Sequence, residues 1–191
     1  MKVTCVLGSP RRWGNTAFLS EVIAETAEQK GAEVETFVLN KLNFKGCQAC
    51  MSCKGKSEKC VVKDDMGPVL DSVLESDVLV LASPVYFGDI TSQAKAFVDR
   101  SFSFLVPEYA KKETPSRLAP GKKMVIVLAQ GQPDDSLFAD IFPRYEAFFR
   151  WYGFTEVIPV RACGVYDKND AKDREELVEM AKEAGLRIMG A

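Results

Sequence analysis

The sequence predicts an α/β fold in which five parallel strands form one doubly wound sheet with helices on both faces. Short apolar runs typical of buried strands alternate along the chain with segments of helical spacing. Parallel neighbours need crossover connections, and the intervening helices supply them. With 47% hydrophobic and 27% charged residues, the 191-residue chain is expected to form one domain, residues 1–191, with a sizeable core.

The elements follow one another in regular order. The first strand is expected at residues 2–7, and the first helix begins near Thr16 and ends at Gly31. The remaining strands are expected at residues 34–39, 77–82, 124–129 and 155–160. The remaining helices are expected at residues 68–75 with Asp64 or Asp65 as cap, 91–102 with Thr91 as cap, 136–151, and from Asn169 or Asp170 onward.

A sheet of this kind binds ligands at the carboxyl ends of its strands. For the strand order 2-1-3-4-5 the switch point lies between the first and third strands. The loops after Leu7 and Ala82 are therefore expected to meet at one crevice.

The first of these loops, residues 8–16, joins a strand to a helix N-terminus, where free N–H groups and the helix dipole favour an anion. Ser9, Asn15 and Thr16 add short polar groups, and Arg11 or Arg12 could add charge from the rim. The loop has neither the Walker lysine pattern nor G-x-G-x-x-G, so a mononucleotide phosphate is favoured over a triphosphate or dinucleotide. An ordinary capped turn is the alternative.

The second loop carries Pro84, Val85, Tyr86, Phe87 and Gly88. A proline-fixed turn with two aromatic residues and a glycine can lay backbone amides along the edge of a planar ring, and flavin is the natural candidate. Tyr86 and Phe87 could instead be core aromatics. The phosphate loop at the matching place in the topology favours the ligand.

Four cysteines, Cys47, Cys50, Cys53 and Cys60, lie in the segment 43–63 with the spacing C-x2-C-x2-C-x6-C. Thiolates at this spacing can converge on an iron-sulfur cluster. Structural zinc and an unmetallated turn are the alternatives, and a disulfide framework is not expected in a chain without an apolar leader. The nearby Lys45, Lys54, Lys56 and Lys59 could offset the charge of a thiolate-bound cluster.

The chain has no histidine, which removes Ser-His and Cys-His nucleophilic machinery but leaves hydride and electron transfer possible. A net charge of −2 and the absence of a long apolar run predict neither a nucleic-acid nor a membrane partner, so a cytoplasmic protein is expected.

On these residues the chain resembles the flavodoxin-like NAD(P)H-dependent FMN reductases, and within them the iron-sulfur flavoproteins. Gly8-Ser9-Pro10-Arg11 with Gly14-Asn15-Thr16 is similar to the family's FMN phosphate loop, and residues 84–88 to its isoalloxazine loop. Thr91, Gln93, Lys95, Phe97, Asp99 and Arg100 also fit the family's next helix. The cysteine motif is similar to the one that binds a [4Fe-4S] cluster. Residues 129–133 depart from the family's third flavin loop.

The resemblance implies an FMN-dependent oxidoreductase that couples two-electron flavin chemistry to one-electron transfer through the cluster, with no catalytic side chain. It also implies NAD(P)H as a transient donor, a small-molecule or protein redox partner such as ferredoxin, and a homodimer or homotetramer. Aromatic segments 102–109 and 148–154 could supply the interface, and the alternative is that they complete the core of the monomer. A cluster-free NAD(P)H-dependent FMN or quinone reductase, and a non-catalytic redox sensor or electron carrier, are the alternatives.

Overall fold

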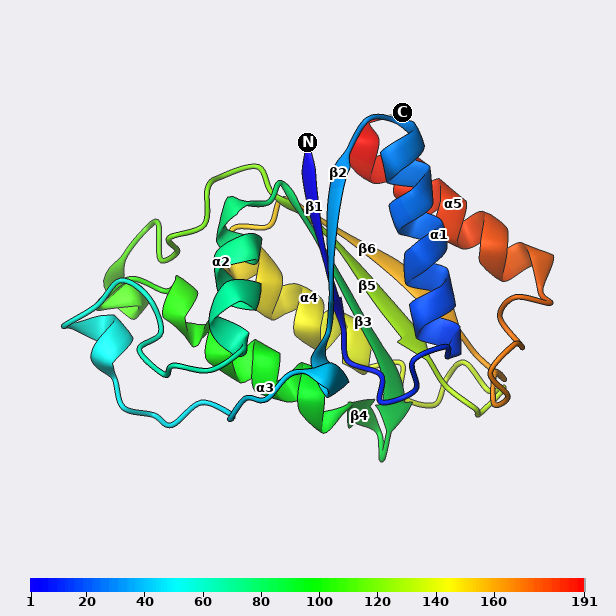
Figure 1. Ribbon diagram of the computed structural model, residues 1–191, viewed down its shortest axis with the longest axis horizontal. Helices are drawn as coiled ribbons and strands as arrows, with labels where there is room; N and C mark the ends of the chain where they lie inside the picture. Colours follow the sequence, from blue (N-terminus) through cyan, green and yellow to red (C-terminus); the bar gives the residue numbers. More distant parts are fainter. Residues whose placement is uncertain (191) are drawn as a thin grey trace.

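A computed structural model describes residues 1–190 of the chain (Figure 1). Five parallel strands form the sheet in the order β2-β1-β3-β5-β6, which is the predicted 2-1-3-4-5 order once a short additional strand, β4, is set aside. The strands are β1 (Lys2–Leu7), β2 (Glu33–Val38), β3 (Val78–Tyr86), β4 (Asp89–Ile90), β5 (Lys123–Ala129) and β6 (Glu156–Ala162). The predicted fold class is confirmed.

The helices cover both faces of the sheet (Figure 1). Their bounds are α1 (Asn15–Gln29), α2 (Met66–Glu75), α3 (Ser92–Arg100), α4 (Ile141–Trp151) and α5 (Glu175–Met189). One core joins α1 and α5 to alternate strand residues such as Val3, Val80 and Val127. A second core joins α2, α3 and α4 to the residues between them, such as Val6, Leu81 and Ile126. Because every central strand is buried on both sides, each reads as a continuous apolar run.

The connection from β3 to α3 contains the element that sequence reasoning missed. β3 continues past the predicted residue 82 to Tyr86 and pairs antiparallel with β4, so that Tyr86 lies opposite Asp89. Phe87 and Gly88 form the turn, and both have positive φ values, 50° and 79°. This is the backbone that a two-residue hairpin turn of the primed type requires. The predicted cap of α3 is confirmed, since the Thr91 hydroxyl accepts a hydrogen bond from the Ala94 N–H.

Two predicted helix starts are wrong. The fourth helix begins at Ile141 and not at Ser136, because Pro143 is tolerated in the first turn of a helix and not in its interior. The preceding turn is held instead by Asp134, whose carboxylate accepts from both the backbone and the hydroxyl of Ser136. The last helix begins at Glu175 and not at Asn169 or Asp170, because the Asp170 carboxylate ties back to the N–H groups of Tyr166 and Asp167 in a loop.

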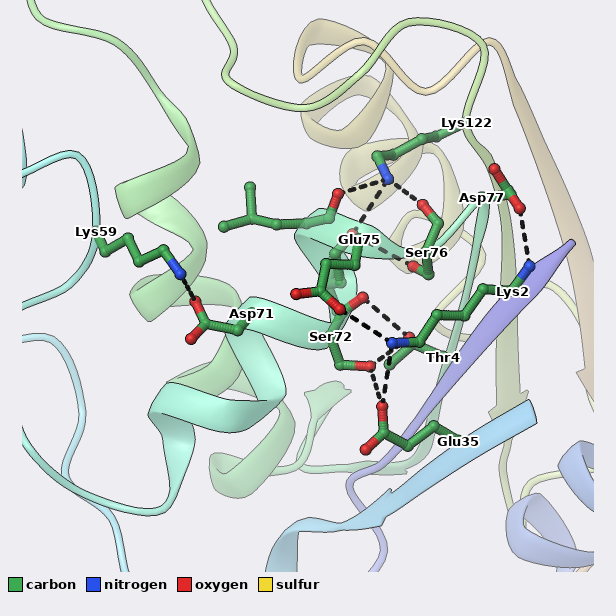
Figure 2. Close-up of polar contacts among 12 residues, drawn as sticks. Lys2, Thr4, Glu35, Lys59, Asp71, Ser72, Glu75, Ser76, Asp77 and Lys122 are labelled. Carbon is green, nitrogen blue, oxygen red and sulfur yellow. Dashed lines mark hydrogen bonds and ion pairs between the residues drawn. The ribbon is translucent and has the colours of Figure 1, made fainter. Parts of the chain in front are cut away.

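The start of α2 lies two residues earlier than predicted, at Met66. Asp64, one of the two predicted caps, accepts a hydrogen bond from the Met66 N–H at 3.2 Å. At the other end of this helix the buried Lys122 ammonium donates to the last carbonyls, among them Leu74 O at 3.0 Å and Ser76 O (Figure 2). Burial lowers the pKa of Lys122. A cation at this position satisfies carbonyls that the helix leaves unpaired.

Candidate functional site

The loops after β1 and β3 meet at the carboxyl edge of the sheet, as the strand order requires. The Thr91 hydroxyl donates to Gly8 O at 2.7 Å, and the Gly8 N–H donates to Ala82 O at 2.8 Å. Gly8 leaves no room for a larger residue, since an added Cβ would stand 2.6 Å from the Ala94 Cβ. The two loops are thus fastened together through Gly8 and Thr91.

A cavity of about 360 Å³ opens between these loops, and we call it the strand-tip crevice. Its volume is that of a small-molecule or cofactor site. Seven of the nine predicted cofactor residues line it: Ser9, Arg11, Asn15, Thr16, Pro84, Val85 and Tyr86. The other two, Phe87 and Gly88, form the hairpin tip beyond its wall, where the Phe87 side chain is fully exposed.

The first turn of α1 faces the crevice without a cap. Its N-cap residue is Gly14, which offers no side-chain acceptor, and the turn contains no acidic residue. The first N–H groups of a helix have no partner within the helix itself. Together with the positive end of the helix dipole they form a site suited to a phosphate or another anion.

Two of the predicted polar side chains are engaged with a loop that sequence reasoning missed. Asn15 donates to Asp167 O at 2.9 Å and accepts from the Ala171 N–H at 3.0 Å. The Arg11 guanidinium donates to Tyr166 O at 3.1 Å. The segment after β6 is thereby drawn to the first loop, and Val165 and Tyr166 complete the wall of the crevice. A sequence separation of about 150 residues left no local pattern to reveal this contact.

The connection after β5, residues 129–133, also reaches the crevice. Ala129 and Gly131 line it, and a Cβ at Gly131 would lie 3.0 Å from the Tyr166 ring. The Gln130 amide bonds three carbonyls, those of Gln132, Asp134 and Leu137, and so holds the connection in place. A larger groove of about 550 Å³ lies on another part of the molecule, between α1 and the edge strand β2, and touches the first loop only through Arg12 and Trp13.

The four predicted metal-binding cysteines line one narrow hollow of about 20 Å³ together with Arg100 and Phe102, and we call it the cysteine hollow. All four are free thiols. Cys47 and Cys50 are exposed, whereas Cys53 and Cys60 are half-buried. Among residues 1–190 no three Cys, Asp or Glu side chains are grouped closely enough to hold a single metal ion. In a cuboidal cluster each thiolate binds a different iron, so its ligands stand further apart than those of one ion.

The backbone and charges around the hollow fit a set of thiolate ligands. Ala49 and Met51 have left-handed backbone, with φ of 50° and 56°, which is strained for residues with a side chain and bends the segment between the first three cysteines. Hydrogen bonds from the Ser52 backbone and hydroxyl lower the pKa of the Cys50 thiol. A lowered thiol pKa favours the thiolate form that metals bind.

Of the four lysines predicted to offset thiolate charge, the structure brings one to the sulfurs. The Lys54 ammonium lies 3.5 Å from Cys53 Sγ and also donates to Phe102 O at 2.6 Å. Lys59 turns outward to pair with Asp71 at 2.8 Å (Figure 2). The buried cation of the hollow is Arg100, at the end of α3, which the sequence placed with the flavin loop's helix.

The crevice and the hollow lie at opposite ends of α3. Thr91, which fastens the loops of the crevice, precedes the first residue of this helix, and Arg100, which lines the hollow, is its last. Nine residues at 1.5 Å each make the helix about 13 Å long. The cysteine segment accordingly stands out beyond α2 and α3, away from the strand tips (Figure 1).

Comparison with known proteins agrees with this architecture. The sequence profile of the NADPH-dependent FMN reductase family matches residues 1–139. The chain belongs to this family. An iron-sulfur flavoprotein of Archaeoglobus fulgidus is 38% identical over 104 residues, covering 54% of this chain and 47% of that protein. One from Methanosarcina thermophila is 32% identical over 112 residues, covering 59% and 58%. The predicted family is confirmed, and these relatives bear the name of the predicted iron-sulfur branch. The match spans about half the length of these relatives.

Structures of proteins with a similar fold have been solved. The NAD(P)H:quinone oxidoreductase from Methanothermobacter marburgensis superposes with a TM-score of 0.76 at 18% identity, covering 97% of this chain and 95% of that one. An FMN-dependent NADH-azoreductase from Bacillus anthracis, solved in complex with FMN, gives 0.74 at 17% identity, covering 99% and 100%. At this identity the likeness shows the fold. Among residues 1–190, no helix is both long and apolar enough to cross a membrane.

Proposed function

We propose that the chain is an FMN-dependent oxidoreductase that passes electrons singly through a [4Fe-4S] cluster held by Cys47, Cys50, Cys53 and Cys60. Bound FMN would supply the conversion between two-electron and one-electron chemistry, with the cluster as the one-electron partner. The observation that carries the proposal is that two candidate sites lie at opposite ends of one short helix, α3. The uncapped N-terminus of α1 faces the crevice at one end of α3, and four free thiols line the cysteine hollow at the other.

In this proposal the FMN phosphate is held by Ser9, Arg11, Asn15 and Thr16. The backbone N–H groups at the start of α1 and the Ser9 hydroxyl would make the contacts. Arg11 and Asn15 would act chiefly by fixing the Tyr166 loop that closes the crevice, since their side chains already bond that loop. The absence of acidic residues in the first turn favours an anionic ligand there.

The flavin ring would lie along Pro84, Val85, Tyr86, Phe87 and Gly88. Backbone N–H groups of this segment would stabilise negative charge at the ring's edge. The β3–β4 pairing holds Val85 opposite Ile90, so the segment keeps its place without a ligand. No side chain need act as a proton shuttle, and the chain has no histidine to serve as one.

The separation of the two sites along α3 favours transfer between subunits in a homodimer or homotetramer. Two exposed aromatic residues on α4, Phe148 and Trp151, offer apolar surface for such contact. Their segment, 148–154, and 102–109 are joined within the chain, where the Tyr109 ring lies 5.5 Å from that of Trp151. The electron partner would be a small molecule or a protein such as ferredoxin, with NAD(P)H as a transient donor.

The remaining parts of the proposal concern organisation. Residues 1–191 would form one FMN-binding domain, of which residue 191 lies outside the described part, and 43–63 would be the cluster loop. Six free cysteines among residues 1–190 are typical of a reducing compartment, which favours the cytoplasm.

A cluster-free NAD(P)H-dependent FMN or quinone reductase is the second candidate. It is favoured by the narrowness of the cysteine hollow and by the relative YwqN of Bacillus subtilis, 29% identical, which is named a putative NAD(P)H-dependent FMN-containing oxidoreductase. A non-catalytic redox sensor or electron carrier would also hold the same groups but turn nothing over.

One variant separates these candidates. Cys53→Ser together with Cys60→Ser removes two of the four sulfur ligands and leaves the strand-tip crevice untouched. If the proposal is right, the variant binds FMN as the wild type does but loses transfer to a one-electron acceptor. Unchanged transfer together with steady NAD(P)H oxidation would establish the cluster-free reductase. Bound flavin without turnover in both the wild type and the variant would favour the non-catalytic redox sensor or electron carrier.

A further inference from the structure

Arg100 holds both ends of the cysteine segment. One terminal nitrogen of its guanidinium donates to Lys45 O at 2.9 Å and to Asp64 Oδ2 at 2.8 Å. The other donates to Asp64 Oδ1 at 3.1 Å and to Val62 O at 3.3 Å. Lys45 precedes the first cysteine and Val62 follows the last, so this one side chain, with no exposed surface, closes the segment.

The fifth N–H of the same guanidinium has no partner. Arg100 Nε is the one buried side-chain nitrogen or oxygen in residues 1–190 without a hydrogen bond. A buried donor left unpaired costs free energy, about 1 to 3 kcal/mol, and more for a charged group. Native proteins contain few buried donors without a partner, so an acceptor for this N–H is expected in the functional protein.

The cysteine hollow is where that acceptor would lie. Arg100 and Cys60 line it together. No hydrogen bond of ordinary geometry yet joins the Cys60 sulfur to Nε. A thiol is a weak acceptor, whereas a metal-bound thiolate is a stronger one.

The other two cations beside the hollow donate to backbone carbonyls. Lys54 donates to Phe102 O and Leu105 O at 2.6 and 2.8 Å and lies over the Phe102 ring. The Arg117 guanidinium donates to the carbonyls of Ser103 and Cys53 at 2.9 and 3.1 Å. Arg100 alone among these three keeps a buried donor without a partner.

We propose that Arg100 is a positioning residue of the cluster site, whose Nε–H donates to the Cys60 thiolate once that thiolate is a cluster ligand. This inference rests on the proposed function. An N–H bond to a ligand sulfur stabilises the more negative, reduced state of a cluster and so raises its reduction potential. The remaining four N–H groups fix the ends of the segment that carries the cysteines.

The test exchanges the arginine for a residue of equal charge. Arg100→Lys keeps the cation beside Asp64 but loses the planar fork and the Nε–H. After anaerobic reconstitution we expect the variant to lose iron to a chelator about tenfold faster than the wild type, the effect of one charge-assisted hydrogen bond. We also expect a more negative midpoint potential in an EPR-monitored redox titration, which a purely structural role would not shift.

Arg117→Lys is the matched control. It makes the same exchange at an arginine next to the hollow whose guanidinium donates to the backbone carbonyls of Ser103 and Cys53, so the midpoint potential should equal that of the wild type. A wild-type potential in Arg100→Lys overturns the inference while leaving the cluster in place. Wild-type protein that takes up no iron overturns the proposed cluster, and the role of Arg100 falls with it.

If Arg100→Lys does not fold, the wild type itself supplies the measurement. Protein labelled with ¹⁵N-arginine should show one Nε–H resonance that is shifted by the cluster and protected from exchange on loading. Arg117→Lys should retain this resonance. A spectrum in which no such resonance appears on loading contradicts the inference.

Discussion

The strand-tip crevice and the cysteine hollow are built in different ways, although one helix joins them. The crevice is made by backbone: parallel strands deliver their loops to one edge, and hydrogen bonds through Gly8 and Thr91 fasten them. The hollow is made by side chains, because segment 43–63 contains no strand and one short 3₁₀ turn at Ser52–Lys54. Its ends are fixed by a buried ion pair. The fold of the strand-tip crevice should therefore tolerate changes of side-chain charge, and the cysteine hollow should tolerate changes of side-chain volume.

The largest expected effect follows from breaking the ion pair of the hollow. Asp64→Ala leaves the Arg100 guanidinium buried without its carboxylate, and loss of one partner of a buried pair costs about 3 to 5 kcal/mol. Urea denaturation of the whole chain should show this loss. Asp71→Ala removes the partner of the exposed pair with Lys59 and should cost less than about 1 kcal/mol. Equal losses in the two variants would contradict the account.

A change of side-chain volume should destabilise the crevice more than the hollow, the reverse of the charge change. Gly8→Ala forces a Cβ to within 2.6 Å of the Ala94 Cβ and 3.2 Å of Ala82 O, so it should cost about 1 to 3 kcal/mol and weaken FMN binding. Gly46→Ala, in the cysteine segment, meets no atom within 4 Å and should change neither quantity. Calorimetric titration with FMN and thermal unfolding measure both. Normal FMN affinity in Gly8→Ala would show that the crevice is not assembled as described.

Acid should loosen the hollow before the crevice. Although burial alone would raise it, the pKa of Asp64 is lowered by its hydrogen bonds with Arg100 and the Lys45 N–H. A carboxyl whose pKa is depressed by folding contributes stability above its unfolded pKa, here 3.8, and loses it as pH falls through the folded value. Hydrogen exchange below about pH 4 should therefore rise in residues 45–64 ahead of β1 and β3. In Asp64→Asn this acid step should disappear, and its persistence would assign the step to another group.

The smallest expected effect lies at the hairpin tip of the crevice. Phe87 has φ of 50°, a conformation that Asn adopts more readily than an aromatic residue. Phe87→Asn should raise the free energy of unfolding by less than about 1 kcal/mol, whereas Phe87→Ala, which removes the same ring without favouring this backbone, should give no gain. Denaturant midpoints compare the two. A gain with alanine would mean that exposure of the ring, and not the backbone, is the cost.

The same contrast explains what the sequence could predict. The strand order and the two loops of the crevice follow from periodicity and topology, so Ser9, Thr16, Pro84 and Val85 were found to line one cavity. The Tyr166 wall could not be predicted, because Asn15 and Arg11 reach it across the fold and no local pattern marks it. The late start of α4 could have been predicted from the sequence, because Pro143 is disfavoured in the interior of a helix that begins at Ser136.

In the hollow the sequence identified the four cysteines but not the cation that supports them. Proximity in the sequence indicated four lysines as the supporting cations, but one of them, Lys59, pairs with Asp71 on α2. Arg100 comes from 40 residues beyond Cys60, and only the packing of α3 against the segment buries it there. The roles of the cysteines as ligands and of the crevice residues as FMN contacts stay predictions.

One measurement tests the central claim, that the chain holds a flavin at the strand tips and an iron-sulfur cluster in the cysteine hollow. Protein purified without oxygen is analysed for flavin, iron and sulfide in the same sample, with its absorption spectrum. The account predicts about one FMN, four irons and four sulfides per chain, with flavin bands on a broad cluster shoulder. Colourless protein that takes up neither group on reconstitution would contradict it.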